Sequence, residues 1–411
     1  MPEIRFYGFE DFWEETKLGQ ISEIKTGPFG STLHAEDYVE NGIPIITTEH
    51  FKKGSLPILK DGTPQVSESD YIRLKSYILL DGDLVFSRVG SVDINALVTS
   101  FQEGWLFSGR VLRVRPQKKY NSDFLHSLLD TTAVKNHVLS RAVGQTMPSI
   151  NTEILKETEL NLTSNFIEQQ KIGAFFKQLD DTIALQQRQL ERLKDSKQGF
   201  LQKMFPKDGE SVPEVRFSGF VEDWDECKLG EHANFRRGSF PQPYGNKEWY
   251  DGEGAMPFVQ VVDVTDHLVL VDNTKQKISK LAQPKSVFVP EGKVVVTLQG
   301  SIGRVAITQY NSFVDRTILI FENFEKKTDE HFWAYTIQKK FNIEKRKAPG
   351  GTIKTITKEA LSSFEIGLPE YKEQQKIGKF FKQLDETIAL HEKELDLLKE
   401  TKKAFLQKMF V

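Results

Sequence analysis

The chain contains 411 residues, 38% of them hydrophobic and 27% charged, which is the profile of a globular protein with room for roughly two to four domains. No apolar run reaches the ~20 residues of a membrane span, the N-terminal stretch lacks the apolar core of a secretory signal, and the single cysteine, Cys227, excludes an internal disulfide framework; we therefore expect a cytoplasmic protein. The net charge of −3 argues against a uniformly basic nucleic-acid binder, but residues 231–360 carry 19 Lys and Arg against 15 Asp and Glu, so a local basic face remains open.

Two parts of the sequence each occur twice. The repeated pairs are Pro2–Gly19 with Pro213–Gly230, and Glu168–Phe205 with Glu373–Phe410, the latter identical at 26 of 38 positions. Between them, residues 21–165 and 231–370 have diverged. A repeat distance of 205 to 211 residues far exceeds that of solenoid repeats and indicates duplicated domains. One frame that holds two different inserts indicates a single recognition device built twice, for two targets.

Both inserts are predicted to be rich in β-structure. Ile78–Ser100 places a glycine turn between an apolar run and an alternating one, and Val287–Thr308 has the same form. A second glycine, Gly90 or Gly300, interrupts the strand that follows. Side chains suited to base edges or phosphates cluster near that glycine; they are Ser87, Arg88, Ser91, Thr297, Gln299, Ser301 and Arg304. A surface hairpin with incidental polar residues is the alternative.

Each insert then predicts a helix followed by a glycine loop. The helices are expected around Ser122–Leu139 and Asp329–Ile343. Asn151 or Thr152, and Thr357 in the second copy, are candidates to cap the next short helix. The loops combine glycine, hydroxyls and cations, which suits a phosphate backbone, and their candidate DNA contacts are Arg141, Gln145, Thr146, Lys345, Arg346, Lys347, Thr352 and Lys354. A structural turn with solvated lysines is the alternative.

The loops at the start of the two inserts differ most. Lys25–Tyr38 and Phe235–Tyr250 occupy equivalent positions but share little sequence, and loops that differ between equivalent domains are where different targets would be read. The candidate DNA contacts here are Lys25, Ser31, Arg236 and Arg237. The second loop also contains PQPY at Pro241–Tyr244, a weak likeness to the (N/D)PP(Y/F) motif of amino-methyltransferases that lacks its Asn or Asp.

The closely matching segments predict two long helices. Their apolar residues follow a four-three spacing over more than four heptads, as in a coiled coil. The apolar positions of this seam are Ile172, Phe176, Leu179, Ile183, Leu190, Leu193 and Phe200 in the first copy and Ile377, Phe381, Leu384, Ile388, Leu395, Leu398 and Phe405 in the second. At 1.5 Å per residue, the stretch from residue 172 to 204 would be about 50 Å long.

So narrow an apolar stripe needs a partner, and antiparallel pairing of the two copies around a pseudo-two-fold axis would supply one. In the symmetric register Phe176 would face Phe405 and Phe200 would face Phe381. Lys402 would lay its stem along the seam and keep its ammonium in water. The alternative is that each helix packs on its own neighbouring domain.

The sequence contains no recognisable catalytic motif. It has no GxxxxGK[ST] loop for a nucleoside triphosphate, no HExxH zinc motif and no GxSxG nucleophile turn. We therefore interpret the chain as a recognition protein.

Taken together, these features resemble the DNA-specificity subunit of type I restriction–modification systems. The resemblance covers the whole chain and rests on the tandem arrangement together with KLG at Lys17–Gly19 and Lys228–Gly230, the GDLVFSRVG and GKVVVTLQG strands, and LPEYKEQQKI at Leu368–Ile377. The first copy departs from this pattern before its helix, because LTSNFIEQQKI has Thr163 in place of proline and one extra residue.

The resemblance implies an α+β fold with a pseudo-two-fold internal duplication. Two β-rich target-recognition domains with small helical parts, residues 1–165 and 207–370, would be separated by two long antiparallel coiled-coil helices, residues 166–206 and 371–411.

The resemblance also implies a division of labour between subunits. The chain would have no activity or cofactor of its own, and each domain would read one half of a bipartite site in double-stranded DNA. The helices would set the distance between the halves and bind two modification subunits, which methylate adenine with S-adenosylmethionine. Restriction (motor–nuclease) subunits would add cleavage that depends on ATP and Mg. The main alternative is a scaffold that does not bind DNA and holds two partner proteins through its inserts.

Overall fold

The computed structural model describes residues 2–28, 32–51, 54–207, 209–347 and 358–410. They form two compact units: unit 1 comprises Met1–Gln187 with Lys393–Val411, and unit 2 comprises Arg188–Glu392. The boundary crosses both long helices, so each unit contains one insert together with part of each helix. None of the described helices has the length and apolarity needed to cross a membrane.

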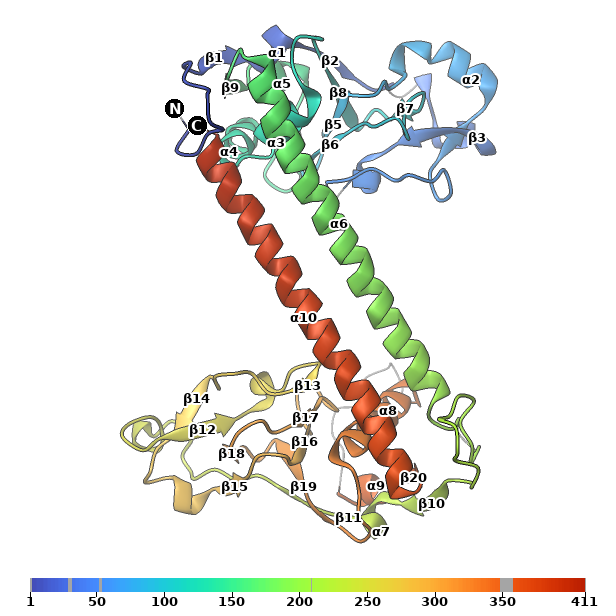
Figure 1. Cartoon of the computed structure of the whole chain (residues 1–411), viewed down its shortest axis with the longest axis vertical. Helices are drawn as coiled ribbons and strands as arrows, with labels where there is room; N and C mark the ends of the chain where they lie inside the picture. The colour runs from blue at the N-terminus through green and yellow to red at the C-terminus, as the bar shows by residue number, and fades with distance from the viewer. Residues whose placement is uncertain (1, 29–31, 52–53, 208, 348–357, 411) are drawn as a thin grey trace. The chain divides into compact units, whose positions relative to one another are not determined.

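Unit 1 contains two sheets that share a core (Figure 1). The main sheet is antiparallel, in the order β2 (Ser22–Thr26), β8 (Val111–Pro116), β5 (Leu84–Ser87), β6 (Asn95–Leu97). The second has the order β4 (Gln65–Val66), β3 (Tyr38–Ile46), β7 (Leu106–Phe107), with β3 and β7 parallel. In β5, Leu84 and Phe86 face the helices while Val85 faces the second sheet. Burial on both faces explains why Leu84, Val85 and Phe86 form an unbroken apolar run.

Unit 2 repeats this arrangement with one strand added to each sheet. Its main sheet has the order β11 (Ala233–Arg237), β19 (Ile318–Phe324), β16 (Val294–Thr297), β17 (Val305–Ile307), β13 (Leu268–Val269). Its second sheet has the order β14 (Gln276–Ile278), β12 (Met256–Val259), β18 (Ser312–Val314), β15 (Val287–Val289). Val294 and Val296 of β16 pack toward the helices and Val295 toward the second sheet, as in β5. A small antiparallel pair closes each unit, β1 (Glu14–Lys17) with β9 (Glu159–Leu162) and β10 (Asp225–Lys228) with β20 (Glu365–Leu368).

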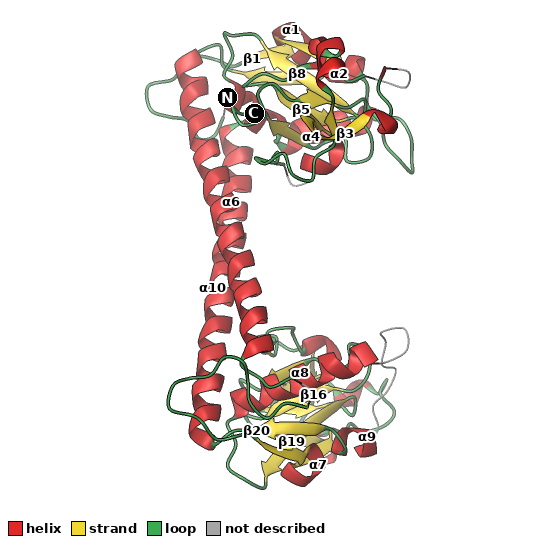
Figure 2. Cartoon of the chain, turned by 90° about the vertical axis from the view of Figure 1, so that its right-hand side faces the viewer, coloured by secondary structure: helices red, strands yellow, loops and turns green. Residues whose placement is uncertain are grey.

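The shorter helices lie around the sheets of their own unit (Figure 2). In unit 1 they are α1 (Leu18–Ile21), α2 (Glu68–Arg73), α3 (Ser122–Leu129), α4 (Thr132–Arg141) and α5 (Thr152–Lys156), and in unit 2 they are α7 (Leu229–His232), α8 (Glu330–Lys347) and α9 (Lys358–Ser362).

The helix predicted over residues 122–139 is two helices. The chain breaks at Asp130, and the Thr131 hydroxyl accepts a hydrogen bond from the Val134 amide (3.4 Å) to start α4. Asn151 caps α5 as predicted, accepting from the Ile154 amide at 2.9 Å. Thr357 lies outside the described residues.

The two long helices are α6 (Phe166–Lys203) and α10 (Tyr371–Met409). Every apolar position of the predicted seam is buried or half-buried except Phe200, which is 37% exposed. Within unit 1, Phe175 packs edge-on against Phe405 at a centroid distance of 5.0 Å, and within unit 2, Phe200 packs against Phe380 at 5.1 Å. The ion pairs Asp180–Lys402 in unit 1 and Lys197–Asp385 in unit 2 lie one turn further along. Together with the ring contacts they show that the segments of α6 and α10 inside each unit run antiparallel.

The predicted register is wrong at the phenylalanine layers, because each helix carries two adjacent phenylalanines. Phe175 contacts Phe405 and Phe380 contacts Phe200, so these partners are shifted by one residue from the expected ones. Phe176 and Phe381 are fully buried and pack against Phe410 (5.5 Å) and Phe205 (6.1 Å), which lie just beyond the end of the other helix. Both phenylalanines of each pair therefore contact the other copy of the repeat, and the second of each pair also belongs to the core of its own domain.

The polar layers of the stripe contain ion pairs between the two helices. In unit 1, Lys402 Nζ lies 2.7 Å from Asp180 and 3.1 Å from Asp130, so its ammonium is bound by carboxylates and does not extend into water as expected. At the equivalent layer of unit 2, Lys197 Nζ lies 2.5 Å from Asp385. These ion pairs are half-buried, and ionic groups removed from water in this way are best attested as devices that specify register.

The repeated EQQKIG motif joins each long helix to its domain. Glu168 is fully buried and accepts from both Nε (2.5 Å) and Nη2 (2.9 Å) of Arg5, and Glu373 pairs with Arg216 in the same bidentate way at 2.7 Å. Each arginine comes from the repeated segment at the start of its unit. The two repeats therefore recur together because they bind each other.

The first glutamine of the motif contacts the start of α3 in unit 1 and of α8 in unit 2. Gln169 Oε1 accepts from the Asn121 amide (2.9 Å) and Gln374 Oε1 from the Asp329 amide (3.1 Å). Gln169 Nε2 also donates to the Thr163 carbonyl at 2.7 Å. The equivalent amide of Gln374 donates to the Pro369 carbonyl (2.9 Å), just before α10 begins, so the extra residue of the first copy leaves this contact unchanged.

Candidate nucleic-acid interface

Two loops predicted separately in the first insert lie together in unit 1. The turn after β5 and the glycine loop after α4 form a small antiparallel contact, with a bridge between Val89 and Ser149. The Gly90 amide donates to the Pro148 carbonyl (2.8 Å), and the Ile150 amide donates to the Arg88 carbonyl (2.9 Å). Gly90 has a φ of 83°, a left-handed conformation that favours glycine in this turn. Ser91, Gln145 and Thr146 are exposed on these loops.

A third loop, the turn from β7 to β8, joins the same group. The Arg88 amide donates to the Arg110 carbonyl at 2.9 Å, and Arg88 Nη1 lies 3.3 Å from the Gly109 carbonyl oxygen. Three loops distant in sequence thus meet at one end of the main sheet. Loops carried at the end of a rigid sheet are a common platform for recognition.

Unit 2 places its equivalent turns in the same way. The Leu298 amide donates to the Thr317 carbonyl (2.8 Å), which joins the turn after β16 to the turn between β18 and β19. Gln299 and Ser301 are exposed on the first of these turns. The glycine loop of unit 2, with Thr352 and Lys354, lies outside the described residues.

Two of the hydroxyls predicted to contact DNA are buried in the structure. Ser87 is 4% exposed and donates to the Val89 carbonyl (3.0 Å), and Thr297 is fully buried and donates to the Ser301 carbonyl. Both occupy the last position of equivalent strands. This corrects the expectation that they face DNA, because each hydroxyl instead closes the turn that follows its strand.

Several predicted cations already have partners within their own unit. Lys25 donates to the Ser76 carbonyl (3.0 Å), Arg141 to the Glu157 carbonyl (3.1 Å). The arginines of unit 2 with acidic partners are Arg236, 2.7 Å from Glu322, and Arg304, 2.8 Å from Asp266. A nucleic-acid phosphate would have to displace the two carboxylates, so these cations are weaker candidates than the sequence suggested.

For the other predicted cations the structure gives only their exposure or their position on a helix. Arg237 is exposed at the end of β11. Lys345, Arg346 and Lys347 form the end of α8, where their side chains are not described. Ser31 also lies outside the described residues.

Two exposed arginines that were not among the predicted contacts, Arg110 and Arg316, lie on the equivalent turns. Neither side chain has a carboxylate partner among the described residues. A signal for them was present in the sequence, because FSGRVLRV at Phe107–Val114 aligns with VDRTILIF at Val314–Phe321 and each turn contains an arginine.

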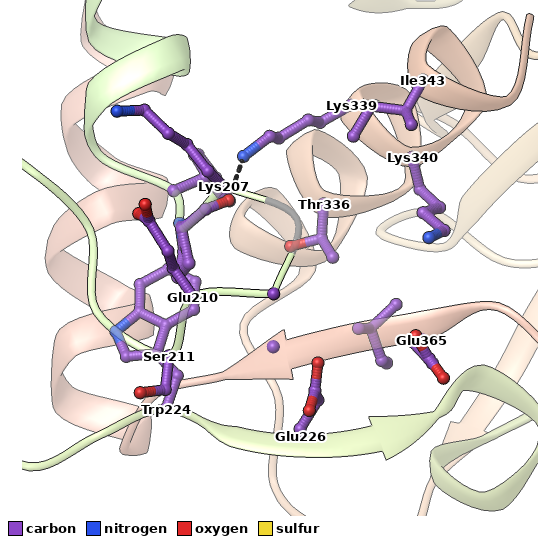
Figure 3. A pocket seen from close by; sticks show the side chains of 15 residues that line it. Lys207, Glu210, Ser211, Trp224, Glu226, Thr336, Lys339, Lys340, Ile343 and Glu365 are labelled. Carbon is purple, nitrogen blue, oxygen red and sulfur yellow. Dashed lines mark hydrogen bonds between the residues drawn. The ribbon is translucent and has the colours of Figure 1, made fainter. Parts of the chain in front are cut away.

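Unit 2 also contains a pocket of about 200 Å³, where the segment after α6 packs on α8 and β20 (Figure 3). Lys339 Nζ donates to the Pro206 carbonyl (2.7 Å), and Lys340 lies 3.6 Å from Glu344. The lining mixes lysines with Glu210, Glu226 and Glu365, and its two α8 lysines are already engaged. We therefore do not assign the pocket to nucleic acid. Among the described residues, no group of three or more His, Cys, Asp or Glu side chains could hold a metal ion.

The chain is similar to a known protein family along most of its length. Residues 10–195 and 221–400 match the family described as type I restriction modification DNA specificity domain. The chain is 26% identical over 430 residues to a protein of Methanocaldococcus jannaschii named as the MjaX type I restriction enzyme specificity subunit, covering 98% of this chain and 96% of the relative. It is 22% identical over 419 residues to the MjaIX type I restriction enzyme specificity subunit of the same organism, covering 97% and 92%.

A solved structure shares the fold. The type-I restriction-modification system S subunit from M. genitalium matches with a TM-score of 0.66 at 15% identity, over 100% of this chain and 99% of that one. Because the family match spans most of both repeats, the chain belongs to the type I restriction-modification DNA specificity family, as its tandem sequence predicts.

Proposed function

We propose that this chain recognises a bipartite site in double-stranded DNA as the specificity subunit of a type I restriction–modification complex. One observation carries the proposal: the two units present equivalent turns on the same strand frame, but those turns carry different side chains. Arg88 and Arg110 of unit 1 are replaced by Leu298 and Thr317 in unit 2. A common frame with different loop chemistry suits two readers of different sequences.

Each unit would read DNA with its converging loops. Exposed hydroxyls and backbone amides suit phosphate oxygens, whereas Arg and Gln can bond bidentately to guanine and adenine edges. Gln299 of unit 2 and Gln145 of unit 1 are exposed candidates for base contacts. The chain's net charge of −3 requires that any such electrostatic attraction be local to these loops.

The long helices would bind two modification subunits in equivalent ways. The repeated stripe and its antiparallel pairing within each unit favour a coiled coil. The contacts Arg5–Glu168 and Arg216–Glu373 hold the two helix starts in the same relation to their domains. Two equivalent sites suit two copies of one partner. That partner would supply S-adenosylmethionine and adenine methylation, and restriction subunits would supply ATP- and Mg-dependent cleavage.

The test is to map methylated sites in cells that express this chain with its modification subunit. We expect a motif with two specified halves separated by a spacer. Replacing residues 231–370 with the insert of a relative should change one half and preserve the other, and replacing residues 21–165 should do the reverse.

Two outcomes would oppose the proposal. Changes in both halves after a single replacement would refute one reader per unit. A purified complex that binds no DNA, even at low salt where phosphate contacts are strongest, would favour a protein scaffold instead.

A further inference from the structure

One turn has the same backbone hydrogen bonds in the two units. It connects β7 to β8 in unit 1 and β18 to β19 in unit 2. Four backbone amides donate to carbonyls at this turn in each unit, at distances between 2.8 and 3.1 Å. In unit 1 the bonds run from Ser108 to Ile46, Val111 to Ser108, Arg88 to Arg110 and Gly27 to Val111. In unit 2 the equivalent bonds run, in the same order, from Asp315 to Val259, Ile318 to Asp315, Leu298 to Thr317 and Gly238 to Ile318. These bonds tie each turn to both sheets of its unit, so a side chain on the turn projects from a rigid base.

Each turn carries one exposed arginine, but at different positions. In unit 1 it is Arg110, the third residue after β7, and in unit 2 it is Arg316, the second residue after β18. Neither guanidinium has a carboxylate partner among the described residues, unlike Arg236 and Arg304, which are paired. A nucleic acid that binds Arg110 or Arg316 would therefore displace no intramolecular ion pair.

Unit 2 holds its arginine over an aromatic ring. The Arg316 guanidinium carbon lies 5.1 Å from the centroid of Tyr244, within cation–π range. The Tyr244 hydroxyl donates to the buried carboxylate of Asp315 (2.7 Å), which also accepts from the Thr317 amide (2.9 Å). Burial, and then the hydrogen bond to Asp315, raise the pKa of Tyr244, so the ring stays neutral and keeps donating.

Tyr244 is held in place by two other aromatic residues of unit 2. Its ring stacks on Phe240 at a centroid distance of 5.2 Å, and the Tyr250 hydroxyl donates to its carbonyl at 2.7 Å. The PQPY segment, which weakly resembles a methyltransferase motif, thus has a different role: its tyrosine is the platform under Arg316.

We propose that Arg110 and Arg316 are the principal guanidinium contacts of unit 1 and unit 2 with DNA. The proposal rests on the function proposed above and names the side chains that perform it. A planar guanidinium matches a pair of acceptors, either two oxygens of a phosphate or O6 and N7 of guanine. Because the arginine is shifted by one position between two equal turns, the units would address different points of their half-sites.

The test uses the full chain in complex with its modification subunits and a library of random-sequence duplexes from which bound DNA is enriched. Arg110→Ala and Arg316→Ala are compared with Lys118→Ala and Lys327→Ala, since neither lysine has a carboxylate partner among the described residues. These matched variants also remove one exposed cation each, but beyond the far ends of β8 and β19, about 20 Å along the strand from the turns. Arg316→Lys keeps the charge and removes the planar fork. Thermal melting of each variant shows that the fold is retained.

We expect each arginine variant to lose roughly tenfold to a hundredfold in affinity for the wild-type motif, and each lysine control to lose little. If the arginine reads guanine, its own half of the motif should change and the other half should persist, and Arg316→Lys should not restore it. If it binds phosphate, affinity should fall for all sequences, with a salt slope lower by about one, and Arg316→Lys should restore most of it.

Wild-type affinity and an unchanged motif for folded Arg110→Ala and Arg316→Ala would overturn this inference and leave the proposed function standing. A wild-type complex that enriches no motif would instead overturn the proposed function itself.

Discussion

Replacing Gly173 with alanine should destabilise unit 1, although alanine is the better helix former. Gly173 lies inside α6 where the start of α3 approaches it. A Cβ at this position would lie 2.5 Å from Asn121 Oδ1 and 2.7 Å from the Phe124 amide nitrogen. Both atoms belong to the N-cap of α3, in which Asn121 Oδ1 accepts from the Phe124 amide at 2.9 Å. The added methyl group must therefore push α3 away from α6.

The magnitude follows from three contributions. Alanine gains about 1 kcal/mol of helix propensity over glycine. Overpacking of a tight interface typically costs about 1–3 kcal/mol, and a displaced N-cap costs about 1 kcal/mol. The expected net loss is about 1–3 kcal/mol. Gly378→Ala in unit 2, where the Cβ would lie 2.2 Å from Asp329 Oδ1, should behave in the same way.

Gly199→Ala is the matched control in the same helix. No atom lies within 4 Å of a Cβ at Gly199, and the second copy has Ala404 at this position. This variant should gain up to about 1 kcal/mol from helix propensity alone. The same glycine-to-alanine change should therefore lower the free energy of unfolding at position 173 and raise it at position 199.

Urea unfolding followed by tryptophan fluorescence measures the stability of both variants, and hydrogen exchange of the α3 amides reports the local effect. Trp13 packs edge-on against Phe124, with centroids 5.8 Å apart, so its emission responds to displacement of α3. Equal stabilisation by both alanines, with unchanged exchange in α3, would refute the close-approach argument.

Three further predictions address the ion pairs and the long helices. Arg216→Ala should cost about 3–5 kcal/mol, because it leaves the fully buried carboxylate of Glu373 without its partner; a urea-unfolding loss below about 1 kcal/mol would contradict this. Burial alone would raise the pKa of Asp130, but the charges of Lys402 and Lys135 outweigh burial and hold this pKa below its usual value. The stability that Asp130 contributes should therefore be complete above about pH 4 and should be lost as the pH falls through the lower pKa of the folded state. Lys402→Gln should weaken this acid dependence in melting temperatures measured from pH 6 to pH 2, and an unchanged pH profile would argue against the pairing. One heptad added to each long helix at equivalent points adds about 10 Å of helix and should lengthen the spacer of the methylated motif by about three base pairs; unchanged spacing in an assembled complex would show that the helices do not set it.

The sequence by itself determined the plan of this protein. The two repeats predict a duplicated frame, and the strand orders of the two units match apart from one strand added to each sheet of unit 2. The four-three stripe predicts two long helices, and its positions are largely buried. These features are readable because a helix or strand has a fixed period, so an apolar pattern reports which face is covered regardless of what covers it.

Only the tertiary structure decided which polar side chains are available at the candidate interface. Ser87 has the residue type of a phosphate contact, but it is the last residue of a buried strand and its hydroxyl bonds to the backbone. Arg304 is neutralised by Asp266, which lies 38 positions away, whereas Arg316 stands over Tyr244, which is 72 positions away by their numbering.

The sequence also does not show which partner each phenylalanine of the long helices contacts, although the adjacent phenylalanines lie on the same apolar stripe. Phe175 contacts Phe405 of the other helix, whereas Phe176 lies in the domain core and contacts Phe410, just beyond the end of that helix. Sequence periodicity is a local property and gives the face of an element. The partner of a side chain is a property of distant segments brought together by packing, and for Arg110, Arg316 and Phe176 that packing decides the role.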